Sequence, residues 1–231
     1  MNNLQKIGGW AALYEAVAYI VGIVFFVAIV DYTGVDDPAQ KVALLVDNQA
    51  AIQLVILIIY VIFGIALVAL ALALHEKLKE GAPALMQIAT ALGLIWAGVV
   101  IASGMVFNIG MGDVIQLYDT DPTQAATIWL AIDAVFNGIG GGVEILGGLW
   151  TLLVSWAALR IGTFSKALNY LGLVVGVAGS ITLIPAFGEI GGMIFGLGQI
   201  VWFAWLGIAM LRQSAGRAET VNTLMPQQRA A

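Results

Sequence analysis

The sequence contains no cysteine and only one histidine, His75, among its 231 residues. Without cysteine there is no disulfide framework, no thiolate nucleophile and no cysteine-ligated metal site. A single histidine also excludes a bis-histidine haem site within this chain. The sequence lacks a basic stripe with interleaved aromatic residues, so we expect no nucleic-acid partner.

The sequence also lacks the signatures of zinc proteases, serine hydrolases and P-loop enzymes. It shows no nucleophile–base pair and no metal cluster, so an intramembrane enzyme is the least favoured class of function. We therefore name no catalytic residue, no metal ligand and no cofactor.

Charged residues are scarce, at 10% of the chain, whereas 61% of the residues are hydrophobic. Soluble domains have about 25% charged and about 45–50% apolar residues. This composition predicts an all-α integral membrane protein. A span needs about 20 apolar residues, and six segments qualify, which predicts a bundle of six transmembrane helices in one domain over residues 1–212: 7–30, 52–74, 85–109, 139–159, 167–184 and 190–211. The polar segment 213–231 is predicted to be a flexible cytoplasmic tail.

The distribution of basic residues predicts the orientation of these spans. The first ten residues lack the charged region and cleavage site of a secretory signal, so the first apolar run is expected to remain as a span. Placing the N-terminus inside leaves Lys41 as the one basic residue outside. By the positive-inside rule, both termini are expected in the cytoplasm. The basic residues on that side are then Lys6, Lys77, Lys79, Arg160, Lys166, Arg212, Arg217 and Arg229.

The two long outer loops share a helix-start pattern. Each has an Asp followed by Pro and, two residues later, Gln, beginning at Asp37 and at Asp121. This pattern is typical of an N-capped helix with Pro at its first position, so a short amphipathic helix is predicted in each loop. A fourth helix running from Pro122 to Arg160 would be about 58 Å long. We therefore expect either an outer projection or a bend near Gly138–Gly142.

The loop pattern belongs to a longer internal match. At one offset, Gln53, Tyr60 and Gly64 correspond to Asn137, Glu144 and Gly148. We interpret the match as a parallel repeat that forms three in–out–in helix hairpins. Glycine-rich helices also produce such matches by chance, and that alternative stays open.

Glu144 is the leading candidate for a functional residue, because it lies within an apolar, glycine-rich segment. A charged carboxylate at the bilayer centre costs about 2.5–3.5 kcal/mol on insertion scales. If the helix is straight, Glu144 lies on a narrow polar and small-residue stripe with Asp133, Asn137, Gly140, Thr151 and Ser155. Such a stripe must face protein or a water-filled cavity.

Two states of Glu144 are compatible with the sequence, since no Lys or Arg lies within a predicted span. One is a neutral acid that forms an interhelical hydrogen bond, with Asn137, Gln53, Tyr60 and Gln199 as candidate partners. The other is a carboxylate neutralised by a bound cation. Glu15 is a second buried acid, which either bonds to Tyr14 or Tyr19, or extends toward the inner interface, or joins Glu144 in a polar track.

These residues support two hypotheses about function. The first is a binder or transporter of a small lipophilic or cationic molecule, with or without proton coupling, whose cavity contains Glu144, Asn137, Gln53, Tyr60, Glu15 and Gln199. The alternative is a structural or accessory membrane subunit whose acids only form hydrogen bonds between helices. In either case the partners include the lipid bilayer. Glycine faces at Gly172/Gly176 and Gly188/Gly192/Gly196 favour packing against a second copy or another membrane protein.

Three stretches carry a resemblance to a known family. They are Ile7-Gly8-Gly9 with Leu13-Tyr14, the inner loop from Leu74 to Leu78, and the ending from Gly198 to Arg212 that contains Trp202-Phe203-Ala204-Trp205. In these stretches, and over nearly all of its length, the chain resembles an uncharacterised family of bacterial multi-span membrane proteins, a family of domains of unknown function. The resemblance implies a bacterial plasma membrane location. It implies no activity and no catalytic residues.

Overall fold

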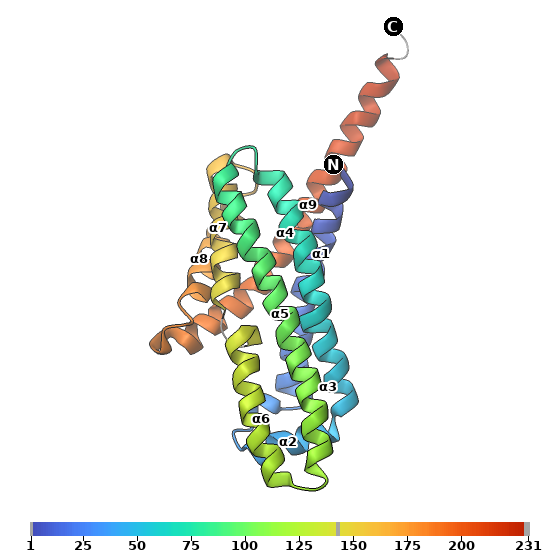
Figure 1. Ribbon diagram of the computed structural model, residues 1–231. Coiled ribbons are helices and arrows are strands. Elements are labelled where there is room, and N and C mark those ends of the chain that lie inside the picture. The colour runs from blue at the N-terminus through green and yellow to red at the C-terminus, as the bar shows by residue number, and fades with distance from the viewer. Residues whose placement is uncertain (1, 142–143, 229–231) are drawn as a thin grey trace.

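A computed structural model describes residues 2–141 and 144–228, with side chains described for 3–140 and 144–213. The described chain is all-α, as predicted (Figure 1). Its elements, in order, are α1 (Asn2–Ile23), η1 (Val24–Ile29), η2 (Tyr32–Gly34), α2 (Pro38–Asp47), α3 (Gln49–Ile56), η3 (Leu57–Ile62), α4 (Phe63–Leu78), α5 (Pro83–Tyr118), α6 (Pro122–Phe136), η4 (Asn137–Gly141), α7 (Ile145–Ile161), α8 (Lys166–Ser180), η5 (Pro185–Phe187) and α9 (Gly188–Gln228).

Five helical stretches are long and apolar enough to cross a membrane, so the chain is a multi-pass membrane protein. They are Asn3–Ile29, Gln49–Leu78, Pro83–Tyr118, Pro122–Ile161 and Pro185–Gln213. The prediction of six full spans needs correction at segment 167–184. There, α8 has only 15 residues and is about 22 Å long, less than the hydrocarbon core of about 30 Å.

Helix α8 ends at Ser180, and the chain turns before α9 starts at Gly188. The N–H of Thr182 bonds to the carbonyl of Gly179, three residues back, instead of the carbonyl four residues back that continues an α-helix. The helix does not resume before Pro185, because a residue that precedes proline is disfavoured in the helical conformation, and Ile184 is extended, with φ −85° and ψ 115°. The predicted segment 167–184 ends directly before this proline, and its mostly apolar last residues gave no sign of the earlier helix end.

The two ends of the bundle differ in charge. The N-terminus and the α4–α5 and α7–α8 connections lie at one end, whereas α2 and the α5–α6 connection lie at the other (Figure 1). We call the first the basic end, since Lys77, Lys79, Arg160 and Lys166 lie in or beside those connections. The second is the α2 end, which carries Lys41. That the basic end faces the cytoplasm stays a prediction.

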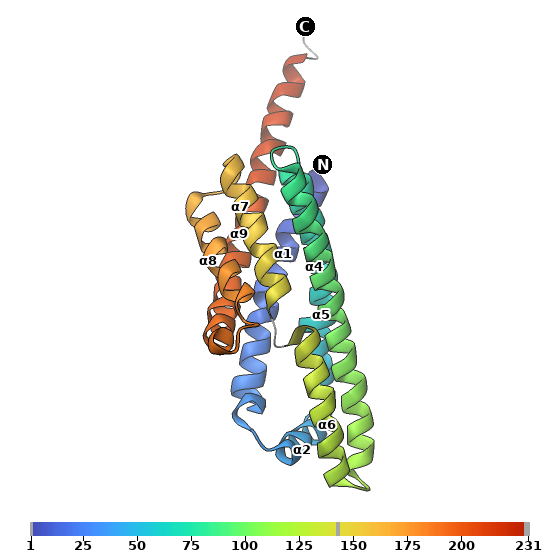
Figure 2. The same ribbon diagram turned by 60° about the vertical axis from the view of Figure 1, so that its left-hand side comes forward.

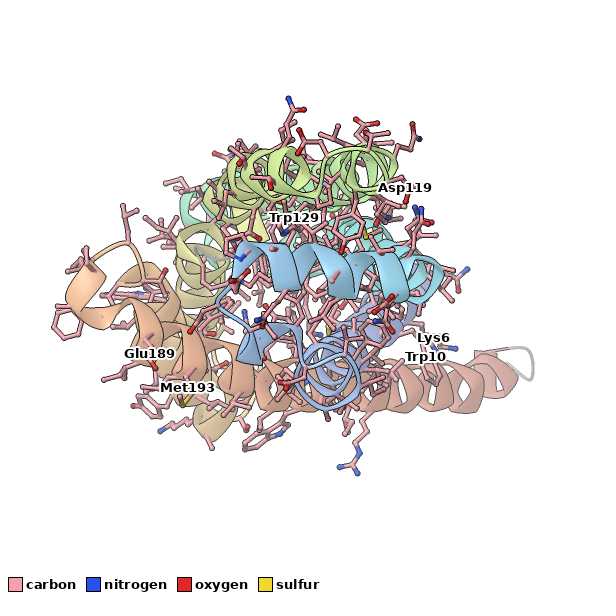
Figure 3. The ribbon with its side chains drawn as sticks, turned by 90° about the horizontal axis from the view of Figure 1, so that it is seen from below. Lys6, Trp10, Asp119, Trp129, Glu189 and Met193 are labelled. Carbon is pink, nitrogen blue, oxygen red and sulfur yellow. The ribbon has the colours of Figure 1, made fainter. Side chains whose placement is uncertain are left out.

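Both predicted helix caps are confirmed. The Asp37 side chain accepts hydrogen bonds from the backbone N–H groups of Ala39 and Gln40, at 2.7 and 3.1 Å. The Asp121 side chain accepts one from the N–H of Gln124 at 2.9 Å. The first cap starts α2, which lies across the end of the bundle, and the second starts α6 (Figures 1 and 3).

The C-terminal segment differs from the expected flexible tail in one respect. Helix α9 runs to Gln228 without interruption, so segment 213–228 is helical in the structure and projects beyond the bundle (Figure 1). Extending an existing helix requires no new nucleation, so even a polar segment can continue it. Residues 229–231 lie outside the described part.

Two hydrophobic cores hold the described helices together. The larger, toward the basic end, is built around Trp96, Trp150, Trp202 and Phe203, whose rings contact one another at 5.3 to 6.4 Å between centroids. In this region α7 packs directly on α8, and a Cβ built at Gly148 would lie 2.8 Å from the carbonyl oxygen of Gly176. The smaller core, toward the α2 end, surrounds Phe107, Met111 and Trp129.

Candidate functional site

The fourth predicted helix is broken, so the expected bend near Gly138–Gly142 is confirmed. Helix α6 passes into the π-helical η4, where Gly140 has a non-helical φ of 175° and ψ of 10°. Helix α7 then begins at Ile145, with Glu144 as its N-cap residue. Residues 142 and 143, which complete the predicted bend, lie outside the described residues. Figure 2 shows the break near the middle of the long axis of the molecule.

The turn between α8 and α9 holds Glu144 in place. The backbone N–H of Glu144 donates to Thr182 Oγ1 at 3.1 Å, and Thr182 Oγ1 itself donates to the carbonyl of Gly179 at 2.8 Å. The Glu144 side chain makes no capping hydrogen bond to α7. The carboxyl group of Glu144 is therefore free to interact with a molecule in the space beside the helix break.

That space is a cavity of about 550 Å³. Most of its walls come from α1, η1, η3, α5, α6 and η4, with further residues from η2, α2, α3 and α4. Its lining includes Tyr19, Ile23, Val27, Tyr60, Trp96, Phe107, Asp133, Asn137, Gly140 and Glu144. Along α5 the lining runs from Trp96 to Phe107, which is about 16 Å at 1.5 Å per residue. The cavity is therefore long enough for a molecule of ordinary ligand size.

Three π-helical segments meet at this cavity. The lining includes Phe26 and Val27 of η1, Tyr60 of η3, and Asn137 and Gly140 of η4. π-Helical turns are rare and occur frequently at functional sites, because they redirect side chains and free backbone groups from the regular ladder. Three of them around one cavity favour a binding role for it.

The cavity walls are rich in aromatic rings. Those of Tyr19, Phe26, Tyr32, Tyr60, Phe63, Trp96, Phe107 and Phe136 line it. Tyr60 packs edge-on against Phe136, and Phe107 does so too, with centroids 5.2 and 5.0 Å apart. An aromatic face carries a partial negative charge that attracts cations.

Glu144 has no counter-charge among the residues that the structure describes. Its carboxyl group takes part in no salt bridge and accepts no hydrogen bond there, and the phenols of Tyr19 and Tyr60 line the same cavity. The break also places the C-terminal end of α6–η4 and the N-terminal end of α7 at the cavity. The first of these ends carries partial negative charge and favours a cation, whereas the second carries partial positive charge and stabilises the Glu144 carboxylate itself.

The α2 end of the cavity has a different chemistry. Lys41 and Asp133 both line it, and Lys41 Nζ lies 5.2 Å from the centre of the Tyr32 ring. Burial, followed by the negative charge of Asp133, raises the pKa of the Tyr32 phenol, while a hydrogen bond from Trp129 Nε1 at 3.0 Å opposes this. Tyr32 is therefore a neutral hydroxyl at physiological pH.

The structure brings together three of the six residues predicted for the site. Glu144, Asn137 and Tyr60 line the cavity, as do Asp133 and Gly140 from the predicted polar stripe. Thr151 and Ser155, the remaining members of that stripe, are buried beyond the break, where α7 packs on α8. The amide of Asn137 donates to the carbonyl of Asp133 at 2.9 Å, within its own helix.

The other three predicted residues lie outside the cavity lining. Gln199 is fully buried and donates from Nε2 to Thr151 Oγ1 at 2.8 Å, which links α9 to α7. The backbone carbonyl of Gln53 accepts a hydrogen bond from the Asn108 amide. Glu15 is 0% exposed, and neither of its carboxyl oxygens has a hydrogen-bond partner in the described structure.

Sequence reasoning missed most of the aromatic wall. Tyr19 entered the prediction only as a partner for Glu15, although it lines the cavity one helical turn beyond that residue. Phe63, Trp96 and Phe107 gave no signal, since an aromatic residue in an apolar helix is equally compatible with lipid contact. Among the described residues, no group of three acidic or histidine side chains is arranged to hold a metal ion.

Comparison with known proteins gives one match. No curated protein and no solved structure matches the chain. A family model described as a domain of unknown function, DUF4386, matches residues 7–209. The match covers most of the 231 residues and confirms the resemblance seen in the sequence. The chain therefore belongs to the DUF4386 family of domains of unknown function.

Proposed function

We propose that this membrane protein binds a small organic cation in the cavity, with the carboxylate of Glu144 as the counter-charge. The observation that carries the proposal is the position of this carboxyl group. It lies among aromatic rings, at the break of a helix, without a basic side chain beside it in the described structure. A bound cation supplies the charge that the protein does not.

The walls of the cavity favour an organic cation over a metal ion. Hard metal cations need several oxygen ligands at once, and the described residues offer no such cluster. Aromatic faces, in contrast, are suited to ammonium and phosphonium groups whose charge is spread over apolar substituents. Aromatic rings of α1, η3, α5 and α6 surround the space next to Glu144.

Among proteins that bind small molecules, we favour a transporter, because transporters bind their ligands where a membrane helix is interrupted near its middle. The proposal includes six membrane-embedded segments, with the short α8 and the start of α9 as the fifth and sixth. It also includes a bacterial plasma membrane location with the basic end in the cytoplasm. The positive-inside rule supports that orientation, and it accords with the return of α9 to the end that holds the N-terminus (Figure 1).

One observation favours the alternative, an accessory subunit that binds another membrane protein. A Cβ built at Gly192 or Gly196 of α9 would meet no atom within 4 Å, so these glycines face outward and are open to a partner helix. The acids, however, do not form the interhelical hydrogen bonds that this alternative expects: within the described structure, the carboxyl groups of Glu15 and Glu144 have none.

The proposal is tested with tetraphenylphosphonium, an organic cation with aromatic substituents. Equilibrium dialysis against purified protein in lipid nanodiscs measures its affinity for the wild type and for Glu144→Gln. We expect the substitution to lower the affinity at least tenfold, since the amide has the same shape without the charge. The matched control is Glu189→Gln, which removes an exposed carboxylate on α9 outside the cavity.

Three results decide between the functions. Selective loss in Glu144→Gln supports the cation site. Equal affinities in both variants and the wild type contradict the role of Glu144. A folded wild-type protein that binds no tetraphenylphosphonium contradicts the cation site itself and favours the accessory function.

A further inference from the structure

We infer that the cation is lipophilic and reaches the cavity from within the membrane, through an opening between η1 and α6. This inference rests on the proposed cation site and specifies both the class of ligand and its route. Its basis is the place where the cavity lining reaches the molecular surface.

One edge of the opening is the face of α1 and η1 that carries Ile23 and Val27. Both side chains line the cavity, and they are 39% and 52% exposed. Their neighbours Ile20 and Val24 are exposed as well. Exposed apolar side chains on a membrane-spanning helix are expected to contact lipid tails.

The other edge of the opening is α6. Its residues Asp133 and Phe136 line the cavity, as does Asn137 directly after it, while Leu130 and Val135 of the same helix are exposed and apolar. Helix α1 packs on α4 and α9, whereas α6 packs on α5 and α2. Figure 2 accordingly shows the η1 end of α1 standing apart from α6, with α2 bridging them at the end of the bundle.

The short helix α8 explains why this side is not covered. The turn between α8 and α9 lies near the level of the helix break, and η1 and α6 extend beyond it toward the α2 end (Figure 2). The turn exposes Leu183, Ile184 and Phe187, which are also apolar. The two edges of the opening, and the nearby turn, thus all carry apolar side chains suited to lipid.

The α2 end offers a less favourable route for a cation. Helix α2 lies across this end, as Figure 3 shows, and it places Lys41 at the cavity. The ammonium group of Lys41 repels a cation that approaches from water. Thr33 is exposed and also lines the cavity, so it marks the point where this second route would begin.

The route selects the ligand. A cation that moves through the lipid must carry enough apolar surface to partition into the membrane, so tetraphenylphosphonium is expected to bind and tetramethylammonium is not. The aromatic walls favour the same molecule, because they stabilise both its charge and its apolar substituents.

The absence of cysteine makes the test direct, since each introduced cysteine is the only thiol in the chain. Val27→Cys marks the membrane opening and Thr33→Cys marks the α2 end. Val174→Cys is the control, on a part of α8 that is 61% exposed and outside the lining. Each variant in nanodiscs is modified with a bulky maleimide, and the binding and release of radiolabelled tetraphenylphosphonium are followed by rapid filtration.

We expect the modified Val27→Cys protein to bind and release the cation at least tenfold more slowly, with both rates reduced alike. Each modified variant is compared with the same variant before modification, and modification at Thr33 or Val174 is expected to change the rates less than twofold in that comparison. Slowing at Thr33 instead of Val27 contradicts the membrane route, and so does slowing at neither position. A lower affinity with an unchanged association rate at Val27 contradicts it too, because the adduct then only fills the site.

The proposed function and the route fail in different ways. If the unmodified protein does not bind tetraphenylphosphonium, the cation site itself is wrong. If it binds tetramethylammonium within tenfold as tightly as tetraphenylphosphonium, the site stands and the requirement for a lipophilic ligand is wrong.

Discussion

The basic end and the α2 end of the bundle are built from similar residues but packed in opposite ways. Toward the basic end, large rings such as Trp150 and Phe203 are fully buried and α7 lies directly on α8. Toward the α2 end, aromatic rings of comparable size surround a cavity of about 550 Å³, and three helical paths contain π-helical turns. The basic end is therefore packed throughout, whereas the α2 end combines a smaller hydrophobic core with the cavity.

Glycine illustrates the same contrast. In α7 and α8 it allows backbones to touch, as at Gly148, where any side chain would overlap the backbone of the neighbouring helix. At Gly140, which lines the cavity, a Cβ would meet its nearest atom, Ser103 Oγ, at 3.5 Å, which is ordinary van der Waals contact. Glycine thus has two different roles in this protein: it allows two backbones to touch at Gly148, and it permits an irregular helix at Gly140.

The largest effect is expected from Gly148→Leu in the packed half. Its side chain would collide with backbone atoms of α8, which cannot move aside as a flexible side chain can. We expect a loss of more than about 4 kcal/mol in folding free energy, enough to abolish the folded protein. Size-exclusion chromatography of the detergent-solubilised protein measures the folded fraction. Gly98→Leu, on an open face of α5, is the control, and equal folding of the two would refute the contrast.

The next prediction compares the loss of stability when one aromatic ring is removed from the packed half and when one is removed from the cavity wall. Trp150→Leu removes a fully buried ring that contacts Trp96, Trp202 and Phe203. It is expected to destabilise the protein by about 3 kcal/mol, within the range for large core truncations. Phe26→Leu, at the cavity wall, should destabilise it by about 1 kcal/mol, because that ring is already partly unpacked. Thermal unfolding followed by intrinsic fluorescence ranks the variants, and the reverse order would contradict the account.

Glu15→Leu tests a polar residue within the packed half. The carboxyl group is buried without hydrogen-bond partners in the described structure, so replacing it with an apolar side chain of similar size should remove an unfavourable burial. We expect a stabilisation of about 1–2 kcal/mol. A destabilised Glu15→Leu protein in the same thermal assay would instead support the polar track between Glu15 and Glu144.

The smallest effect is expected at the cap of α2. Asp37→Ala removes the acceptor for the N–H groups of Ala39 and Gln40 and should cost about 1 kcal/mol of helix stability. Because α2 covers one end of the cavity, its amides should exchange hydrogen several-fold faster while those of α7 stay unchanged. Hydrogen exchange with mass spectrometry measures this, with Asp36→Asn as the control. If the α2 amides exchange at an unchanged rate in Asp37→Ala, the helix is stabilised by its packing on α6 and not by the Asp37 cap.

Much of the scaffold could be predicted from the sequence, because it depends on local patterns. Runs of apolar residues identified five of the membrane helices, and Asp37 and Asp121 identified two helix starts. The break near Glu144 followed from a length argument together with the glycine run. The predicted segment 167–184 stopped directly before Pro185, but the helix itself already ends at Ser180, and the mostly apolar residues that follow hid this earlier end.

The site was only partly predictable, for a different physical reason. The sequence alone identified Glu144 as a candidate, because burying a carboxyl group in a membrane segment costs free energy whichever way the side chain points. The direction in which Trp96, Phe107 or Gln199 points depends on which helices are neighbours, and that is a tertiary property. Polar character within an apolar span therefore grouped Gln199 and Glu15 with the site, whereas the structure buries both outside the cavity lining.

The most direct test of the central claim, that Glu144 is a reachable counter-charge for a cation, is protection from dicyclohexylcarbodiimide. This apolar reagent modifies carboxyl groups in membrane interiors, and mass spectrometry of the peptides identifies the modified residue. We expect that Glu144 is modified, that tetraphenylphosphonium slows this at least tenfold, and that the fully buried Glu15 is not modified. Modification of Glu144 at the same rate with and without the cation, or cation-protected modification of Glu15 instead, would contradict the claim.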